Sequence, residues 1–183
     1  DSFFNEYWRK KPRFFPKLAV ELAEYRHWDN VFVDWRVKRK AARLFLWSSG
    51  DPVRATTVSD VDVIVLACDE ILQQDTPLTV LLNDVELVDQ TLKHIHKAFN
   101  VRQDWRCGDL VATLSGLYSG IGFHAGIEDG FIVQLAGVRE WRLWNPSVLQ
   151  DRYRNFLLGF DCDYDVIVQR PEVQPEFTYT LVP

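Results

Sequence analysis

Residues 115–144 read SGLYSGIGFHAGIEDGFIVQLAGVREWRLW, and the fold predicted for the chain is built around this stretch. Glycines surround a short apolar segment that ends in His124, and glycine permits sharp turns and close backbone approach. An apolar run at 131–135 predicts a strand, and side chains alternate from Arg139 to Trp144 as in a second strand. We therefore expect a tight hairpin-like unit that turns a histidine and an arginine toward one cavity.

The composition predicts one soluble domain spanning residues 1–183. With 183 residues, of which 47% are hydrophobic, the chain can close a single sizeable core. A formal net charge of −5 argues against direct nucleic-acid binding, and no apolar run reaches the roughly 20 residues that span a bilayer. We therefore expect a cytoplasmic protein without membrane contact. Because the chain contains no methionine, we also expect a segment of a longer protein, truncated at both ends.

Short periodic segments predict a mostly β fold that carries helices. Helices are expected at 3–9, 16–25 and 83–99, and strands at 30–37, 41–47, 78–82 and 177–182, with a turn at 50–52. The apolar run at 61–67 suits a buried strand or a core helix, and periodicity does not separate them. Many short strands after a helical beginning predict an antiparallel sandwich or barrel.

Two motifs resemble metal-binding sites, but we do not expect either of them to bind a metal ion. His94 and His96 lie in a predicted helix, where side chains two positions apart point in different directions. The acidic run at 161–165 lacks the glycine and the final glutamate of an EF-hand loop. The three cysteines are widely spaced, which predicts reduced thiols rather than a disulfide framework.

Four segments together resemble a known family. In order and spacing, FFNEYWRKKP, TVLLNDVELVD, DWRCGDLVATLS and GIGFHAGIEDGFIVQLAGVREWRLW resemble the JmjC-type cupin oxygenases, which include the ribosomal oxygenases. The resemblance implies a double-stranded β-helix (cupin or jelly-roll fold) with N-terminal helical decoration. It also implies a dioxygenase that uses iron(II) and 2-oxoglutarate to hydroxylate a side chain of a protein substrate, possibly ribosomal. Family members often form homodimers.

The metal ligands that the resemblance implies are incomplete. The family binds iron through an H-x-D motif and a later histidine, a facial triad that leaves positions open. His124 takes the first position, but Gly126 replaces the aspartate, and the second histidine is expected beyond Pro183. Glu128 and Asp129 are candidates for the missing carboxylate. Asp129 matches a family aspartate that is not used on the metal, which favours Glu128.

The resemblance also implies a cosubstrate site. Arg139 takes the position of the basic residue that pairs with the distal carboxylate of 2-oxoglutarate, and Ser115 and Thr113 match positions that line the same pocket. The alternatives are a surface charge beside Glu140 for the arginine and ordinary strand hydroxyls for the other two. Tyr118 is expected to pack in the core, with lining the approach of the substrate as the alternative.

Gly126 leaves three hypotheses open. An oxygenase in which Glu128 supplies the carboxylate keeps the activity of the family. A halogenase uses the vacated position for a halide, as in other branches of the superfamily. A chain that has lost the metal serves as a binding or assembly module, since metal affinity depends on ligand charge and number.

Overall fold

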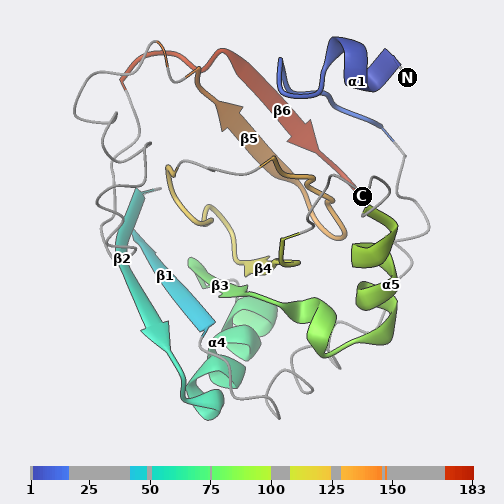
Figure 1. Ribbon diagram of the computed structural model, residues 1–183. Coiled ribbons are helices and arrows are strands. Elements are labelled where there is room, and N and C mark those ends of the chain that lie inside the picture. Colours follow the sequence, from blue (N-terminus) through green and yellow to red (C-terminus); the bar gives the residue numbers. More distant parts are fainter. Residues whose placement is uncertain are drawn as a thin grey trace. The chain divides into compact units, whose positions relative to one another are not determined.

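The computed structural model describes residues 2–16, 42–48, 51–74, 76–99, 108–124, 129–145, 147 and 172–183 (Figure 1). The chain divides into two compact units. Unit 1 comprises Asp1–Arg26, Ala125–Cys162 and Pro171–Pro183, and unit 2 comprises His27–His124 and Asp163–Arg170. Each unit is described by itself.

Unit 2 contains an antiparallel sheet of four strands, in the order β2-β1-β3-β4. The strands are β1 (Ala42–Ser48), β2 (Asp51–Val58), β3 (Leu78–Leu82) and β4 (Ala112–Ser115). All five residues of β3 are buried, as the continuous apolar run predicts, and the strands predicted at 41–47 and 78–82 are confirmed. Burial on both faces makes β3 the centre of the described core.

The turn predicted at 50–52 is wrong at Asp51 and Pro52, because both belong to β2. Proline within a strand is tolerated at a sheet edge or at a bulge, since it has no N–H to donate. Pro52 meets both conditions: β2 is the edge strand, and the register slips between Leu46 and Trp47, directly opposite.

The ambiguous run at 61–67 forms a helix, α4 (Val61–Gln74). Asp60 caps its first turn, since Oδ1 accepts hydrogen bonds from the backbone N–H groups of Asp62 (2.9 Å) and Val63 (3.4 Å). The inner face repeats at helical spacing and packs toward β3; it consists of Ile64, Ala67, Cys68 and Ile71. The aspartate before the apolar run is the signal that favours a helix over a strand.

The helix predicted at 83–99 is wrong as one continuous element. It divides into a 3₁₀ turn, η1 (Val85–Leu87), and α5 (Gln90–Phe99). Asp84 adopts a left-handed conformation (φ 56°), which a helix interior excludes. Asp89 begins α5 by accepting a hydrogen bond from the backbone N–H of Leu92 (2.8 Å).

Unit 1 contains a short helix and a two-stranded antiparallel sheet. The helix α1 (Ser2–Glu6) covers the first half of the helix predicted at 3–9, and the ring of Phe3 in α1 contacts those of Tyr7 and Trp8, which follow it. The sheet pairs β5 (Arg139–Leu143) with β6 (Phe177–Leu181), which confirms both predicted strands to within one residue (Figure 1).

The hairpin-like unit predicted for 115–144 is not observed. The run at 131–135 forms no strand, and the partner of β5 is β6, from a distant part of the chain. Phe131, Ile132 and Val133 are largely exposed, so this run lacks the burial that its apolar character predicted. The double-stranded β-helix stays a prediction, as does the single domain.

Several predictions lie outside the described residues. They concern the helix at 17–25, the strand at 30–37, the acidic run at 161–165, Gly126 and Glu128. None of the helices within the described ranges is long and apolar enough to cross a membrane.

Candidate functional site

His124 presents one ring nitrogen outward. Its side chain is exposed, and Nδ1 lies 3.0 Å from the backbone carbonyl oxygen of Gly122. A carbonyl oxygen only accepts hydrogen bonds, so Nδ1 carries the proton and Nε2 keeps its lone pair. Gly122 has a positive φ of 76°, a conformation that favours glycine and that brings its carbonyl to the ring. Metal-binding histidines are commonly oriented by such a hydrogen bond, so His124 fits a ligand role.

The carboxylate of Asp129 is already engaged. Arg9 Nε donates a hydrogen bond to Asp129 Oδ2 over 2.8 Å, which forms an ion pair within unit 1. Within the described part of the chain, no three histidine, cysteine, aspartate or glutamate side chains are grouped to hold a metal. Of the candidate carboxylates, Asp129 is therefore the poorer, and Glu128 stays a prediction.

Arg139 lies on the less exposed face of β5. Along the strand, Arg139, Trp141 and Leu143 are half-buried, whereas Glu140 and Arg142 are exposed. Glu140 Oε1 accepts a hydrogen bond from Arg142 Nε (2.6 Å) on the exposed face, opposite the face that carries Arg139. Burial lowers the pKa of the Arg139 guanidinium, which nevertheless stays charged in any protein environment. The sheet thus holds a cation on its apolar side.

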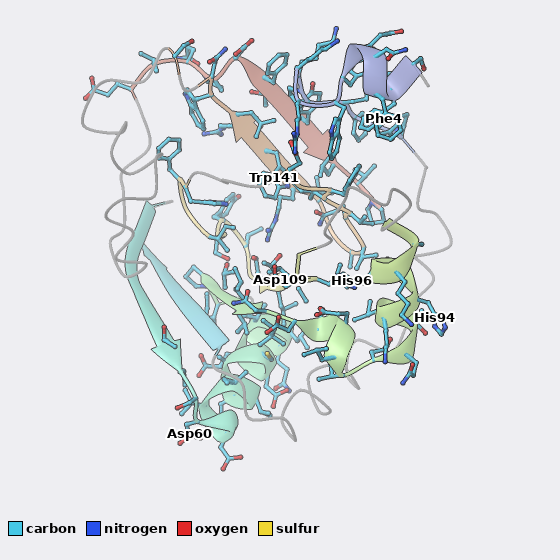
Figure 2. The ribbon with its side chains drawn as sticks, viewed as in Figure 1. Phe4, Asp60, His94, His96, Asp109 and Trp141 are labelled. Carbon is cyan, nitrogen blue, oxygen red and sulfur yellow. The ribbon has the colours of Figure 1, made fainter. Side chains whose placement is uncertain are left out.

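Trp141 shares that face and was missed by the sequence analysis (Figure 2). Its indole Nε1 is buried and has no hydrogen-bond partner among the residues that the structure describes. Directly after β5, Trp144 Nε1 donates to the carbonyl oxygen of Val173 over 2.8 Å. Strand alternation places Trp141 beside Arg139, but no sequence signal shows that its donor lacks a partner.

The hydroxyl of Ser115 belongs to a buried polar cluster. Thr79, directly opposite on β3, is fully buried, and its Oγ1 lies 2.9 Å from Ser115 Oγ and 3.2 Å from Ser119 Oγ. Ser119 Oγ also lies 2.8 Å from the carbonyl oxygen of Gly116. Thr113, two positions before Ser115, is exposed. The two candidate hydroxyls therefore differ in their surroundings, and only Ser115 is half-buried.

Tyr118 does not pack in the core. Its side chain is 81% exposed, so the core-packing prediction is wrong. The backbone at Tyr118 has a positive φ of 56°, which is uncommon for a bulky residue. The turn is fixed by a hydrogen bond from Ser119 N to the carbonyl oxygen of Gly116 (3.3 Å), and it displays the ring to solvent.

His94 and His96, both labelled on α5 in Figure 2, contact different carbonyl groups. His94 Nδ1 lies 2.7 Å from the carbonyl oxygen of Gln90, and His96 Nε2 lies 2.6 Å from that of Gly108. The first contact stays within α5, and the second ties α5 to the segment before β4. Both rings have structural contacts.

The candidate residues fall in both units. His124, Ser115 and Thr113 belong to unit 2, whereas Arg139 and Trp141 belong to unit 1. Their convergence on one pocket stays a prediction. Comparison of the chain with protein-family models, curated proteins and solved structures found no match.

Proposed function

We propose that the protein is an iron(II)- and 2-oxoglutarate-dependent oxygenase of the JmjC-type cupin kind, which hydroxylates a side chain of a protein substrate. The observation that supports this proposal is the half-buried guanidinium of Arg139, at the position where the resemblance places the base that binds the cosubstrate. The planar guanidinium fork of an arginine matches the two oxygens of a carboxylate, which suits Arg139 to the distal carboxylate of 2-oxoglutarate.

The residues present fit part of the implied cofactor set. His124 would bind iron through Nε2, held in orientation by the Gly122 carbonyl, with Glu128 as the proposed carboxylate. Arg139 would bind the distal carboxylate of 2-oxoglutarate, and Ser115 and Thr113 would line the same pocket. Bound iron and 2-oxoglutarate supply the oxidising chemistry for hydroxylation. The protein orients these groups and excludes water from them.

A second candidate is a binding module that has lost the metal. The ion pair between Arg9 and Asp129 favours it, because it engages the one described carboxylate near the H-x-D position. Gly126 itself has no side chain to replace that carboxylate. In this case Arg139 would still bind an organic acid.

Anaerobic iron(II) titration of the intact protein, with and without 2-oxoglutarate, separates the candidates. The oxygenase binds iron, and His124→Ala abolishes binding. His94→Ala is the matched control, because its ring is also exposed and also contacts a backbone carbonyl through Nδ1. Failure of the natural protein to bind iron in the presence of 2-oxoglutarate would remove the enzyme proposal and leave the binding module.

Product analysis then defines the reaction. On admission of oxygen, the oxygenase releases succinate and adds one oxygen atom to a protein substrate, for which ribosomal proteins are the first choice. A chlorinated product in the presence of chloride would instead select the halogenase hypothesis. A Gly126→Asp variant that gains iron affinity would show that the position faces the metal.

A further inference from the structure

A cluster of positive charge follows α1. Residues 9–13 read RKKPR, and we call them the basic segment. Its four cationic side chains are all exposed; they belong to Arg9, Lys10, Lys11 and Arg13. The whole chain has a formal net charge of −5, so the basic segment is a local exception on an acidic protein. A concentrated patch of one sign attracts a partner of the opposite sign.

The ring of Tyr7 gathers two of these cations. Lys11 Nζ lies 4.9 Å from the ring centroid, and the guanidinium carbon of Arg13 lies 4.7 Å from it. Arg13 Nη1 also donates a hydrogen bond to the Tyr7 hydroxyl over 3.0 Å. A cation–π contact positions a cation and leaves its charge in place, because the ring is neutral. Tyr7 therefore holds two positive charges ready for an anionic partner.

The end of α1 fixes the backbone of the basic segment. The backbone N–H groups of Lys10 and Lys11 donate to the carbonyl oxygen of Tyr7 over 2.9 Å and 3.1 Å. Arg9 has a left-handed backbone (φ 56°), and its side chain is paired with Asp129. The cations are thus presented from a turn held by hydrogen bonds. Such preorganisation lowers the entropy that binding costs.

Exposed apolar side chains lie beside these cations in unit 1. Phe15 and Phe131 are 40% and 45% exposed, and their rings lie 5.5 Å and 6.4 Å from that of Phe3. The guanidinium carbon of Arg13 lies 5.7 Å from the centroid of the Phe15 ring. Ile132, directly after Phe131, is also exposed. Aromatic rings and arginine are enriched at protein interfaces, and exposed apolar patches with a polar rim mark interaction sites.

The charge of the whole chain favours a short anionic partner over a long one. A nucleic acid carries a negative charge on every phosphate and extends past the basic segment, where an acidic protein repels it. A short acidic segment of a protein stays on the four cations. Apolar side chains within that segment would also cover the rings of Phe15 and Phe131.

We propose that the basic segment, together with Phe15 and Phe131, is a docking surface for a short segment of a partner protein that contains both acidic and apolar residues. Carboxylates of the partner pair with Lys11 and Arg13, and its apolar side chains pack on the two rings. This inference goes beyond the proposed function, because the surface uses neither His124 nor Arg139 and needs no metal ion.

Fluorescence anisotropy with the intact protein tests the chemistry of the partner. The probe is a labelled peptide of repeated Glu-Glu-Leu units, and its neutral counterpart has glutamine in place of every glutamate. The acidic peptide should bind at least tenfold more tightly than the neutral one, and added sodium chloride should weaken its binding.

Paired substitutions test the location of the surface. Lys11→Gln combined with Arg13→Gln should lower the affinity for the acidic peptide roughly tenfold. Lys93→Gln combined with Lys97→Gln is the matched control, because it removes the same charge from exposed lysines of α5. The control variant should bind as the natural protein does. Circular dichroism verifies that both variants fold.

Lysine acetylation followed by mass spectrometry gives the same information without a substitution. In the natural protein, bound acidic peptide should protect Lys10 and Lys11 from acetic anhydride and leave Lys93 and Lys97 reactive. This measurement decides the location even where a variant does not fold.

Three results would overturn the inference. They are equal affinity for the acidic and neutral peptides, equal protection of the lysines in both places, and tighter binding of another anionic partner. Single-stranded RNA and vesicles that contain phosphatidylserine are the alternatives to compare, and preference for either would assign the surface to nucleic acid or to a membrane. Iron(II) and 2-oxoglutarate do not enter these measurements, so their outcome is independent of the proposed function.

Discussion

Arg9 and Asp129 lie 120 positions apart in the chain and form an ion pair in which Nε and Oδ2 are 2.8 Å apart. The contact joins the segment after α1 to the segment that leads toward β5. Phe131 strengthens the connection, because its ring lies 5.8 Å from that of Trp8 and 6.4 Å from that of Phe3. The ion pair thus accompanies an aromatic cluster, and the two contributions can be measured separately.

We expect the aromatic cluster to contribute more stability than the ion pair. The Arg9 and Asp129 side chains are 73% and 36% exposed, so Arg9→Gln should lower the free energy of unfolding by at most about 1 kcal/mol. Phe3 contacts the rings of Phe4, Tyr7, Trp8, Phe15 and Phe131, and Phe3→Ala should cost about 2 kcal/mol or more. Urea denaturation measures both. A larger loss for Arg9→Gln would show that the ion pair dominates.

The same ion pair predicts which acid near the H-x-D position affects metal affinity. Asp129→Asn should leave iron(II) affinity unchanged, because the carboxylate binds Arg9. In the proposed oxygenase, Glu128→Gln should weaken iron binding at least tenfold, since one anionic ligand would be lost. Anaerobic titration compares the two variants. Equal affinities for both would exclude Glu128 as the ligand.

We expect the buried thiol of Cys68 to make the folded protein less stable at alkaline pH. It lies on the inner face of α4, where burial, with a smaller effect of Asp69, raises the pKa of its thiol from 9.0 to about 12. The pKa of this thiol is higher in the folded protein than in the unfolded chain. Its contribution to the free energy of unfolding is therefore complete below about pH 9 and is lost as the pH rises toward 12. In that window the free energy of unfolding should fall by about 1.4 kcal/mol per pH unit from this group.

Urea denaturation between pH 8 and 11 checks this, with Cys68→Ala as the reference that lacks the thiol. Other groups titrate in the same range, so the difference between the two proteins is the relevant quantity. A constant difference across the range would show that the thiol ionises as readily in the folded protein as in the unfolded chain.

Trp141 in β5 and Trp144 directly after it should respond differently to the same substitution in the absence of ligand. Trp144→Phe removes the hydrogen bond to Val173 and should lower the free energy of unfolding by about 1 kcal/mol. Trp141→Phe removes a buried donor that has no partner among the described residues, so it should leave stability unchanged or raise it by about 1 kcal/mol. Thermal unfolding measures both, and a marked loss for Trp141→Phe would reveal an acceptor in the free protein.

Regular elements were predictable where the local pattern is strong. β1, β3, β5 and β6 lie within one residue of their predicted positions, because apolar runs or strict alternation are bounded by polar residues. The prediction of one helix at 83–99 was wrong because Asp84 is left-handed, and the prediction of a strand at 131–135 was wrong because none of the described strands pairs with that run. Whether an apolar run becomes a strand depends on its pairing with a distant segment, and the local sequence does not encode that pairing.

The candidate site was only partly predictable. Alternation places Arg139 on the inner face of β5, and its assignment to a carboxylate came from the family resemblance. The ion pair at Asp129, and a Trp141 donor without a partner among the described residues, depend on groups distant in the chain, so neither was foreseen. The exposure of Tyr118 follows from a backbone conformation that its residue type disfavours.

The contact between His124 and Gly122 sets up a competition. With Nδ1 committed to the carbonyl, a proton and a metal ion must both use Nε2, so only one of them can be present. In the proposed oxygenase, the Gly122 carbonyl would thus decide which ring nitrogen of His124 faces the metal ion.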